Sequence, residues 1–482
     1  MVPSYAAGSF ERDTATTLGD RNQNPKSTVK DIKHTPLSPP FWLRRSHEGG
    51  HVLGCRGPNL HLQLQRGGDI RFALPETEDF LKGDLRRDPS ADLAKAETAK
   101  KVSLPIPPWE PLSEPLLADQ RGTYDRMRAA CPLARSPRGV TLFRHADVVA
   151  AAAAPSAFSS AVSVHRMVPN SLDQPEHTAF RAVIDPFFTP ERMEALEPRV
   201  RRIAREIVGG LPRGITVDAV TEIGYPLAVR AQADWLGWQG IEDELLAWMA
   251  DNHAATRSGD RSRTAAAAAA FDEIVLAQVR RRREMGSAAP EDPTTELLGI
   301  TVNGKLLPDS DIVSILRNWT AGDLASIAAA LGVVVYFLAT HPEVQETLRA
   351  HSDNLAVAVD EMLRIDDPFL VSRRVTTIGT LVAGFELDPG TRIYLNWTSA
   401  NRDEAVFGDP DDYRPDDHAL HNLVYGTGIH VCPGRPLATL ELVVAAKTLL
   451  DMTARVELAA DAKLVRETYP LGGWRRVPVR LG

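Results

Sequence analysis

Apolar positions recur every three or four residues over most of the chain after about residue 105, the spacing of one face of a helix. In the same part of the chain, strands are indicated at GVTLFR (139–144) and in short segments around 373–394. The pattern therefore predicts a mainly α protein with a small β subdomain. The helices that we expect before residue 300 span 123–131, 146–154, 176–184, 190–209, 218–236, 241–255 and 262–284.

The longest predicted helix runs from about Asp309 to about Thr340 and is apolar nearly all round. A helix that is apolar on all sides belongs in the middle of a protein, and the Asp309 side chain can cap this one. Its interior nevertheless contains TAGDLAS (320–326), in which Gly322 costs about 1 kcal/mol relative to alanine. A glycine, an aspartate and a serine inside a buried helix need an explanation other than helix stability.

Residues 1–105 differ from the rest of the chain. They are rich in proline, glycine and charged residues, and long stretches show no helical periodicity. We expect a poorly ordered extension, with a hairpin over the alternating segment 61–74 as the alternative. The proline-rich segment 104–115 marks the boundary, so the predicted organisation is an extension over 1–105 and a compact domain over 106–482.

Composition narrows the class of protein. With 55 Lys+Arg against 63 Asp+Glu, the formal net charge is −8, which argues against general nucleic-acid binding. Three cysteines without a CxxC pair favour a reducing compartment over a disulfide framework. No uninterrupted apolar run approaches the roughly 20 residues that span a membrane, and the N-terminus has no apolar signal core. We therefore expect a cytoplasmic protein without a membrane partner.

The stretch YGTGIHVCPG (425–434) surrounds one cysteine with three glycines. Gly426, Gly428 and Gly434 permit a tight turn and let the backbone approach a planar group closely. A cysteine thiolate is a soft, strongly donating ligand for iron or zinc. The helical pattern after Pro433 places this thiolate next to a helix N-terminus, where a negative charge is stabilised.

This stretch resembles the haem-binding loop of cytochrome P450 enzymes, F-G-x-G-x-H-x-C-x-G, and departs from it only at Tyr425, where Phe is usual. The resemblance covers about residues 106–482 and implies one large haem domain with the cytochrome P450 fold. It implies haem b (iron protoporphyrin IX) with Cys432 as the axial thiolate, whose donation favours O–O cleavage. Tyr425, Gly426 and Gly434 would lie against the macrocycle.

A second segment matches the same family in order and spacing. DEMLR (360–364) supplies Glu361 and Arg364, the family's E-x-x-R pair, whose side chains share one helix face. The resemblance implies a buried structural ion pair that braces the cofactor site. The usual third partner is an arginine, for which Arg414 is the candidate, while Asp417 stands where a basic residue is common.

Four basic residues match positions that bind the haem propionates. His177 and Arg181 in HTAFR are four residues apart on a predicted helix, so both can face one carboxylate. Arg374 in SRRVTT is another such position by resemblance, with Arg373 as its alternative. His430 in the cysteine loop completes the set that two propionates require.

The longest predicted helix resembles the family's oxygen-binding helix, whose pattern is (A/G)-G-x-(D/E)-T. Ala321 and Gly322 fit this pattern, which implies that Ala321 lies beside the cofactor and that Gly322 leaves room for dioxygen. Leu324 and Ala325, however, stand at the positions of the acid and the threonine. This departure leaves the source of the protons that the reaction consumes to other residues.

Asp323 and Ser326 are displaced by one residue from the usual acid and hydroxyl positions. One helical residue is a turn of about 100°, and a locally widened turn could restore the register. We expect these two residues to deliver protons through water, with a back-bonded structural serine as the alternative. The sequence around these residues most resembles a subset of bacterial cytochrome P450 enzymes that are often fused to a reductase.

The resemblance implies a monooxygenase that inserts one atom of O2 into a small-to-medium hydrophobic molecule by hydroxylation, epoxidation or dealkylation. No flavin fingerprint or cysteine cluster follows the haem domain, so we expect electrons from a separate ferredoxin and its NAD(P)H-dependent reductase. Substrate contacts are expected from Trp319 and from the segments 157–173, 218–255 and 369–371. Val164, Met167 and Val168 are either lining residues or ordinary core and loop packing.

Other functions remain open at this point. A peroxygenase or a non-oxygenating haem-thiolate enzyme would also tolerate the altered oxygen helix. His418, His421, His430 and Cys432 lie within 15 residues and are zinc ligand types, so a zinc protein is a rival from another class. A haem-binding sensor without catalysis is the third alternative.

Overall fold

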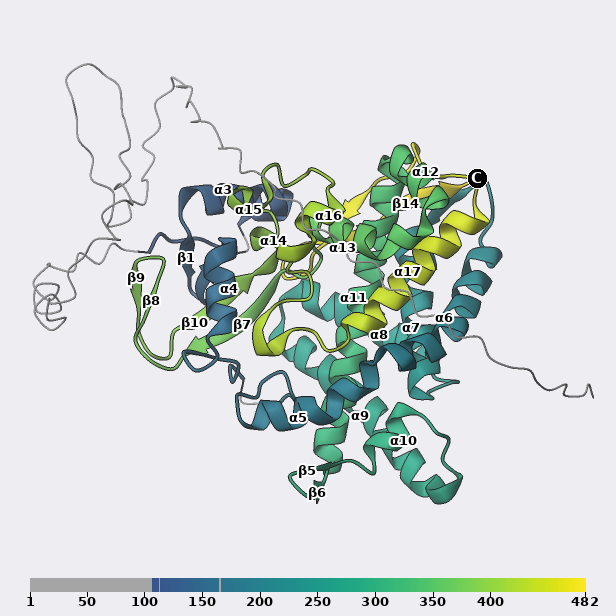
Figure 1. The fold of residues 1–482 in the computed structure, drawn as a ribbon, viewed down its shortest axis with the longest axis horizontal. Coiled ribbons are helices and arrows are strands. Elements are labelled where there is room, and N and C mark those ends of the chain that lie inside the picture. The colour runs from purple at the N-terminus through teal and green to yellow at the C-terminus, as the bar shows by residue number, and fades with distance from the viewer. Residues whose placement is uncertain (1–105, 112, 164–165) are drawn as a thin grey trace, which may run out of the picture. The chain divides into compact units, whose positions relative to one another are not determined.

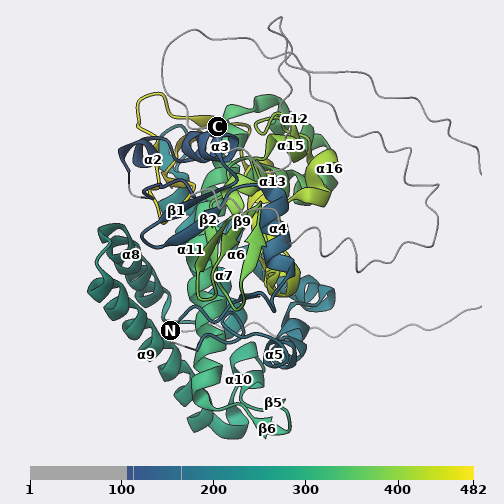
Figure 2. The same cartoon turned by 90° about the vertical axis from the view of Figure 1, so that its left-hand side faces the viewer.

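The computed structural model describes residues 106–111, 113–163 and 166–482, and every structural statement below concerns these residues. The predicted extension over 1–105, including the possible hairpin over 61–74, lies outside them. The described chain is mainly helical, with a small proportion of strand, as the hydrophobic pattern predicts (Figures 1 and 2).

The helices follow the predicted segments closely, with boundaries that shift by up to three residues. A π-helical turn, Ala219–Gly224, precedes α7, where the pattern predicted one continuous helix. The helices are α2 (Glu114–Ala118), α3 (Gln120–Ala130), α4 (His145–Ala153), α5 (Glu176–Ile184), α6 (Pro190–Gly210), α7 (Tyr225–Leu236), α8 (Glu242–Ser258), α9 (Arg261–Met285), α10 (Pro293–Leu297), α11 (Asp309–Thr340), α12 (Pro342–Ala350), α13 (Leu355–Ile365), α14 (Trp397–Ala400), α15 (Glu404–Phe407), α16 (Pro415–His418) and α17 (Arg435–Met452).

The largest sheet has five strands in the order β1-β2-β10-β7-β3. Its β2 and β10 are parallel, although they lie some 250 residues apart in the chain, and the other neighbours are antiparallel. The strands are β1 (Leu133–Ser136), β2 (Gly139–Leu142), β3 (Phe158–Ser159), β7 (Val371–Thr376) and β10 (Arg392–Asn396). This sheet carries the predicted strand at 139–144, the strands β7 and β10 of the predicted region around 373–394, and two strands, β1 and β3, that the pattern did not predict.

The remaining strands form small sheets. A three-stranded sheet has the order β11-β14-β4, and three further strand pairs are hairpins. The strands are β4 (Thr216–Asp218), β5 (Thr301–Val302), β6 (Lys305–Leu306), β8 (Thr380–Val382), β9 (Phe385–Leu387), β11 (Val456–Leu458), β12 (Val465–Arg466), β13 (Trp474–Arg476) and β14 (Pro478–Leu481).

Helix α11 has the predicted boundaries and passes through the core, where it contacts α7, α9 and α17. It is the only helix in the described part of the chain that is long and apolar enough to cross a membrane, but 61% of its apolar window is buried within the protein. The prediction that the Asp309 side chain caps this helix is wrong. Pro308 occupies the N-cap position, and the Asp309 carboxylate instead accepts hydrogen bonds from Arg283 (3.0 Å).

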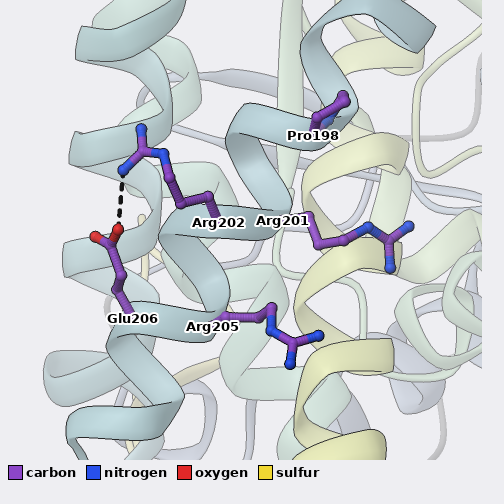
Figure 3. Close-up of a pocket in the computed structure, with 5 residues that line it drawn as sticks. All are labelled: Pro198, Arg201, Arg202, Arg205 and Glu206. Carbon is purple, nitrogen blue, oxygen red and sulfur yellow. Dashed lines mark hydrogen bonds and ion pairs between the residues drawn. The ribbon is translucent and has the colours of Figure 1, made fainter. Parts of the chain in front are cut away.

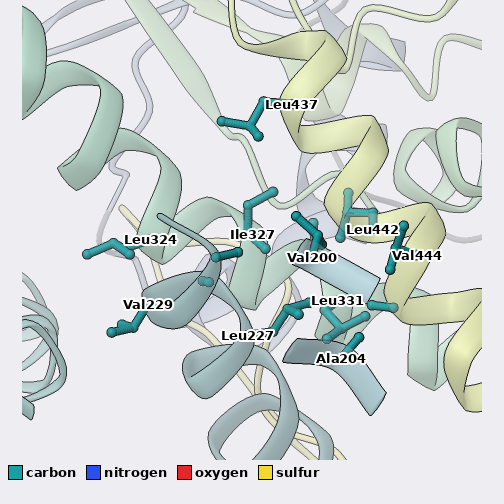
Figure 4. Packing of buried hydrophobic residues seen from close by; sticks show 14 of the residues in the cluster. Val200, Ala204, Leu227, Val229, Leu324, Ile327, Leu331, Leu437, Leu442 and Val444 are labelled. Carbon is teal, nitrogen blue, oxygen red and sulfur yellow. The ribbon is translucent and has the colours of Figure 1, made fainter. Parts of the chain in front are cut away.

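Helices α6, α7, α11 and α17 share one apolar core (Figure 4). Leu324, Ile327 and Leu331 project from α11 and lie in the same cluster as Leu437 and Leu442 of α17. Burying side chains of this size contributes about 1.5–3 kcal/mol each. The packing fixes α17, and with it the loop 425–434 that immediately precedes this helix.

A buried ion pair on α13 ties this helix to the loops that follow the large sheet. Arg364 donates to both carboxylate oxygens of Glu361 (2.8 and 2.9 Å) and to the backbone carbonyls of Asn401 (2.9 Å), Pro410 (3.1 Å) and Asp412 (3.1 Å). Both side chains of the pair are almost fully buried. Such a pair stabilises only when its remaining hydrogen-bonding capacity is met, as it is here.

The prediction that the Arg414 side chain is the third partner of this pair is wrong. The Arg414 guanidinium donates to the carbonyl of Phe407 (3.0 Å), and only its backbone N–H reaches Glu361 (3.0 Å). The side chain that contacts the Glu361 carboxylate is His418, through Nδ1 at 2.7 Å. A histidine one position after Asp417 thus takes the place expected for an arginine.

We expect Arg364→Ala to lower the free energy of unfolding by about 3–5 kcal/mol, because Glu361 would be left as a buried carboxylate without its cation. Urea unfolding of the haem-loaded protein, followed by circular dichroism, measures the change. Arg435→Ala is the matched control, since the Arg435–Asp360 pair (2.8 Å) has a 55% exposed arginine and should contribute below about 1 kcal/mol. Equal losses in the two variants would contradict a structural role specific to the buried pair.

Candidate functional site

A cavity of about 560 Å³ lies between α11, β7 and the loop 425–434. It brings together residues that are about 300 positions apart in the chain, from Pro169 to Leu471. The predicted site residues that line it are His177, Arg181, Gly322, Asp323, Ser326, Arg374, Tyr425, Gly426, His430, Cys432 and Gly434. Ala321, which the pattern placed beside the cofactor, does not line it and packs against the hydrophobic core instead.

The cysteine loop reverses direction through two glycines with left-handed backbone. Gly426 and Gly428 have φ of +70° and +74°, conformations that residues with a Cβ rarely adopt. The Cys432 N–H donates to the Tyr425 carbonyl (2.9 Å) and closes the loop. A Cβ on Gly428 would lie 2.4 Å from the carbonyl oxygen of Ala152, so this glycine also lets the loop pack tightly on α4.

The Cys432 sulfur is surrounded by protein but is exposed toward the cavity. Burial raises the pKa of its thiol, whereas hydrogen bonds from the backbone N–H groups of Gly434 and Arg435 and the charge of Arg181 act to lower it. These amides belong to the first residues of α17 and its N-cap, where the helix dipole favours negative charge. A metal ion bound at the sulfur would therefore find the thiolate form supported by the backbone.

Basic side chains gather on another part of the cavity wall. Arg374 is buried on β7, and its pKa is lowered by that burial. It donates to the carbonyl of Arg373 (2.8 Å), the predicted alternative, whose own side chain is exposed because it alternates to the other face of the strand. Arg181 donates to the carbonyls of Ile429 (3.1 Å) and Val431 (2.8 Å) and so links α5 to the cysteine loop.

Two histidines complete this basic set. The His177 and His430 rings meet edge to face with centroids 4.3 Å apart, and His430 Nε2 contacts the Ser160 hydroxyl (2.8 Å). Burial, Arg374 and His177 lower the pKa of His430 to about 3, and burial and Arg181 lower the pKa of His177. His177 Nε2 is buried without a hydrogen-bond partner among the described residues, which calls for a ligand atom there.

These residues fit haem. The sulfur supplies a metal ligand, the glycine-rich loop gives a close backbone surface for a planar ring, and the Arg181, His177, Arg374 and His430 set is suited to two carboxylates. The buried Arg374 guanidinium makes no hydrogen bond to a carboxylate within the described residues, so the propionates would supply the anions that it lacks.

Gly322, Asp323 and Ser326 form the α11 wall of the cavity. Ser326 follows Gly322 by four residues and Asp323 by three, so these residues share one face of the helix. A Cβ at Gly322 would meet no atom within 4 Å, so glycine leaves open space here. Leu324 is fully buried in the core. The helix is regular from Asp309 to Thr340, so the locally widened turn that would restore the usual register does not occur.

A buried acid on α17 escaped the sequence analysis. Glu441 is fully buried, and neither of its carboxylate oxygens has a hydrogen-bond partner in the described part of the chain. Burial raises its pKa well above the ordinary value, and the Asp323 carboxylate raises it further. Burial also raises the pKa of Asp323 to about 7. The signal in the sequence was an acid on the same helix stripe as the cavity-lining Leu437 and Ala438.

The predicted substrate-contacting residues are partly correct in position. Trp319 and residues 369–371 line the cavity. Met167 and Val168 do not, because this loop turns Pro169 and Asn170 toward the cavity and buries Val168 in the core. Val164 lies outside the described residues.

The candidate zinc ligands do not converge. His418 contacts Glu361, His421 lies beside His145, and only His430 and Cys432 line the cavity. Within the described ranges, no three histidine, cysteine, aspartate or glutamate side chains form a cluster that could hold a metal ion.

Comparison with known proteins agrees with this site. A family model for cytochrome P450 matches residues 256–452. The chain is 30% identical over 314 residues to 6-deoxyerythronolide B hydroxylase of Saccharopolyspora erythraea, an overlap that covers 64% of this chain and 76% of that protein. It is 29% identical over 378 residues to Cytochrome P450 109 of Bacillus spizizenii, covering 74% and 91% of the two chains.

Solved structures give the same result for the fold. The open form of cytochrome P450 EryK from S. erythraea superposes with a TM-score of 0.69 at 27% identity, covering 77% of this chain and 97% of that chain. Sequence and fold thus agree with the resemblance carried by the cysteine loop. The chain belongs to the cytochrome P450 family and is a haem-dependent monooxygenase, an oxidoreductase that incorporates oxygen from O2.

Proposed function

We propose that this protein is a haem b monooxygenase in which Cys432 is the axial ligand of the iron. The observation that carries this proposal is one cavity lined by the sulfur, by four basic side chains and by the Gly322–Ser326 face of α11. When bound, haem supplies the oxygen-activating redox chemistry. The Arg181, His177, Arg374 and His430 set holds the propionates, and Tyr425, Gly426 and Gly434 lie against the ring.

Asp323 and Ser326 hold and deliver protons at the α11 wall, with Gly322 leaving room for dioxygen. The raised pKa of Asp323, about 7, keeps a substantial share of its carboxyl protonated at neutral pH, as a proton donor requires. The fully buried Glu441 supports this state, because two neighbouring buried carboxylates cannot readily both be charged. The carboxyl is thus ready to donate without waiting for a proton from bulk solvent.

The substrate is a hydrophobic organic molecule. Phe188, Trp235 and Trp319 form one aromatic cluster with ring centroids 5.3–5.4 Å apart, and all three line the cavity. Aromatic walls of this kind favour apolar ligands of small to medium size, which the protein then hydroxylates, epoxidises or dealkylates. Few polar side chains interrupt this wall away from the haem-binding residues.

Electrons come from a separate acidic ferredoxin with its NAD(P)H-dependent reductase, in the cytoplasm. Helix α6, which packs along α17, presents a shallow surface recess formed by Pro198, Arg201, Arg202, Arg205 and Glu206. Figure 3 shows Arg201 and Arg205 on the same side of α6, where Arg201 pairs with Glu197, whereas Arg202 turns away and pairs with Glu206 (3.0 Å). Exposed guanidinium groups near the helix that follows the cysteine loop suit a negatively charged partner.

We expect Cys432→Ser to abolish the thiolate-type absorption of the reduced protein with carbon monoxide and to abolish substrate oxygenation, because serine is a poor donor to iron. A carbon monoxide difference spectrum measures this directly. Cys131→Ala, at a buried cysteine outside the cavity, is the matched control and should keep the spectrum. A thiolate-type spectrum that survived Cys432→Ser would overturn the proposed site.

Asp323→Asn and Ser326→Ala should each lower coupled product formation, by roughly a hundredfold or more for Asp323 if it is a proton donor. In the unmodified protein, product formed per NAD(P)H consumed should fall as pH rises through about 7, since the protonated carboxyl is the donating form. Asp323→Asn should remove this pH dependence. Product and NAD(P)H are measured together across pH.

Thr320→Val is the control for these variants. It removes a hydroxyl from the same helix, but that hydroxyl donates to the Leu316 carbonyl (2.6 Å) and does not line the cavity. Coupling should stay unchanged in this variant. Unchanged coupling in both Asp323→Asn and Ser326→Ala would reject the proton-delivery assignment.

Glu441→Gln should stabilise the protein more at about pH 8 than at about pH 5. The folded-state pKa of Glu441 is raised, so its protonated form is favoured by folding and stability is lost as pH rises from the unfolded-state value through the folded-state value. The neutral amide avoids that loss. Thermal unfolding at the two pH values measures the difference, and an equal effect at both would mean that Glu441 is ionised in the fold.

A further inference from the structure

A second, smaller cavity of about 100 Å³ adjoins the main one. Ser326, Pro368, Phe369 and Leu471 line both cavities and form the boundary between them. Most of the remaining wall of this side pocket is apolar, from α11, from the π-helical turn before α7 and from the segment before β13. One part of the wall is polar and consists of Tyr225, His253 and Glu467.

The polar side chains of this wall form a chain of contacts that ends at His253. Glu467 is almost fully buried and receives two hydrogen bonds from Arg257 (3.1 and 2.5 Å). The Arg257 charge also acts on the Tyr225 phenol, whose hydroxyl lies 2.9 Å from His253 Nδ1. The contacts thus begin at the Arg257–Glu467 ion pair, continue through the Tyr225 phenol and end at the buried His253 imidazole.

The positive charge of Arg257 beside the Tyr225 phenol favours the arrangement in which the Tyr225 O–H points away from Arg257 and donates to His253 Nδ1. Burial and Arg257 lower the pKa of His253, so the imidazole is neutral near pH 7. A neutral imidazole that accepts at Nδ1 carries its hydrogen on Nε2.

His253 Nε2 has no hydrogen-bond partner among the described residues, and His253 lines the side pocket with only 7% of its surface exposed. With its hydrogen on Nε2, His253 offers the pocket an N–H donor, in a wall that is otherwise apolar except for Tyr225, Ser326 and Glu467. A donor of this kind discriminates strongly between ligands that can accept a hydrogen bond and ligands that cannot, because an unpaired buried polar group costs free energy.

We propose that the side pocket is a subsite for a hydrogen-bond acceptor, such as a ketone, ester or ether oxygen, on an otherwise apolar substrate, with His253 as the donor. The proposal rests on the proposed function, since the substrate must extend from the side pocket past Ser326 and Phe369 to the Gly322 face of α11. It narrows the substrate class from any hydrophobic molecule to one with an acceptor atom remote from the carbon that is oxidised.

The test compares cyclododecanone with cyclododecane and menthone with its parent hydrocarbon menthane. Dissociation constants come from the shift in haem absorption on ligand binding. We expect His253→Phe to lower the ketone-to-hydrocarbon affinity ratio by a factor of about three to ten, because phenylalanine keeps the ring but removes the donor. Comparing ratios between variants cancels the different hydrophobicities of the two ligands.

Two further variants separate a hydrogen bond from a packing effect. Tyr225→Phe should also lower the ratio, since it removes the O–H that fixes the imidazole hydrogen on Nε2. His341→Phe should leave it unchanged, because His341 stacks on Phe337 at the end of α11 and lines neither cavity. A ratio unchanged by His253→Phe, or a protein that binds neither ketone, would overturn the proposal.

The carbon monoxide spectrum distinguishes this failure from failure of the proposed function. If the unmodified protein shows the thiolate-type spectrum but His253→Phe does not change the ratio, the subsite alone is wrong. If the spectrum is absent, the haem-thiolate assignment itself fails, and the binding comparison no longer bears on catalysis.

Discussion

The position of one sulfur atom depends on the packing of α17 against α6 and α11. Cys432 lies three residues before the first residue of α17, so the core that holds this helix also sets where the sulfur meets the cavity. The backbone N–H groups at the start of the helix point toward the sulfur for the same reason. Apolar packing remote from the cavity therefore controls where the Cys432 sulfur, the proposed iron ligand, faces the cavity.

The polar framework of the site extends well beyond the cavity. Arg364 of the buried Glu361–Arg364 pair donates to the carbonyls of Asn401, Pro410 and Asp412 and so fixes the segments that contain them. His418 contacts the Glu361 carboxylate. These segments lead directly into the cysteine loop. On the opposite side, Arg181 fixes the loop to α5 through two of its carbonyls. Both attachments use arginine, whose planar group can satisfy several carbonyls at once.

Local pattern was sufficient to predict most helices, and the family resemblance pointed to the cysteine loop that lines the cavity. The boundaries of α11 follow from an apolar run whose length no strand could have, and the spacing of His177 and Arg181 follows from helical geometry. The errors concern choices made by tertiary contacts. Asp309 pairs with Arg283 rather than capping its own helix, and His418 rather than the Arg414 side chain reaches Glu361. The residues that neighbour these positions in the sequence do not determine which side chain makes the contact.

The shifted acid on α11 shows where sequence motifs and structure carry different information. Relative to the motif, Asp323 is displaced by one residue, and a locally widened turn was one way to restore the register. In the structure α11 is regular, yet Asp323 and Ser326 both line the cavity, because residues three apart share a helix face. Leu324, at the usual acid position, points into the core instead. The family motif specifies residue types at fixed positions. Helix geometry requires only that an acid and a hydroxyl lie on the face that meets the cavity. Ser326 also borders the side pocket with His253, so the face that we propose for proton delivery adjoins the proposed substrate subsite. A substrate that is held at His253 would then determine how much space remains for water beside Ser326, which links substrate binding to proton supply.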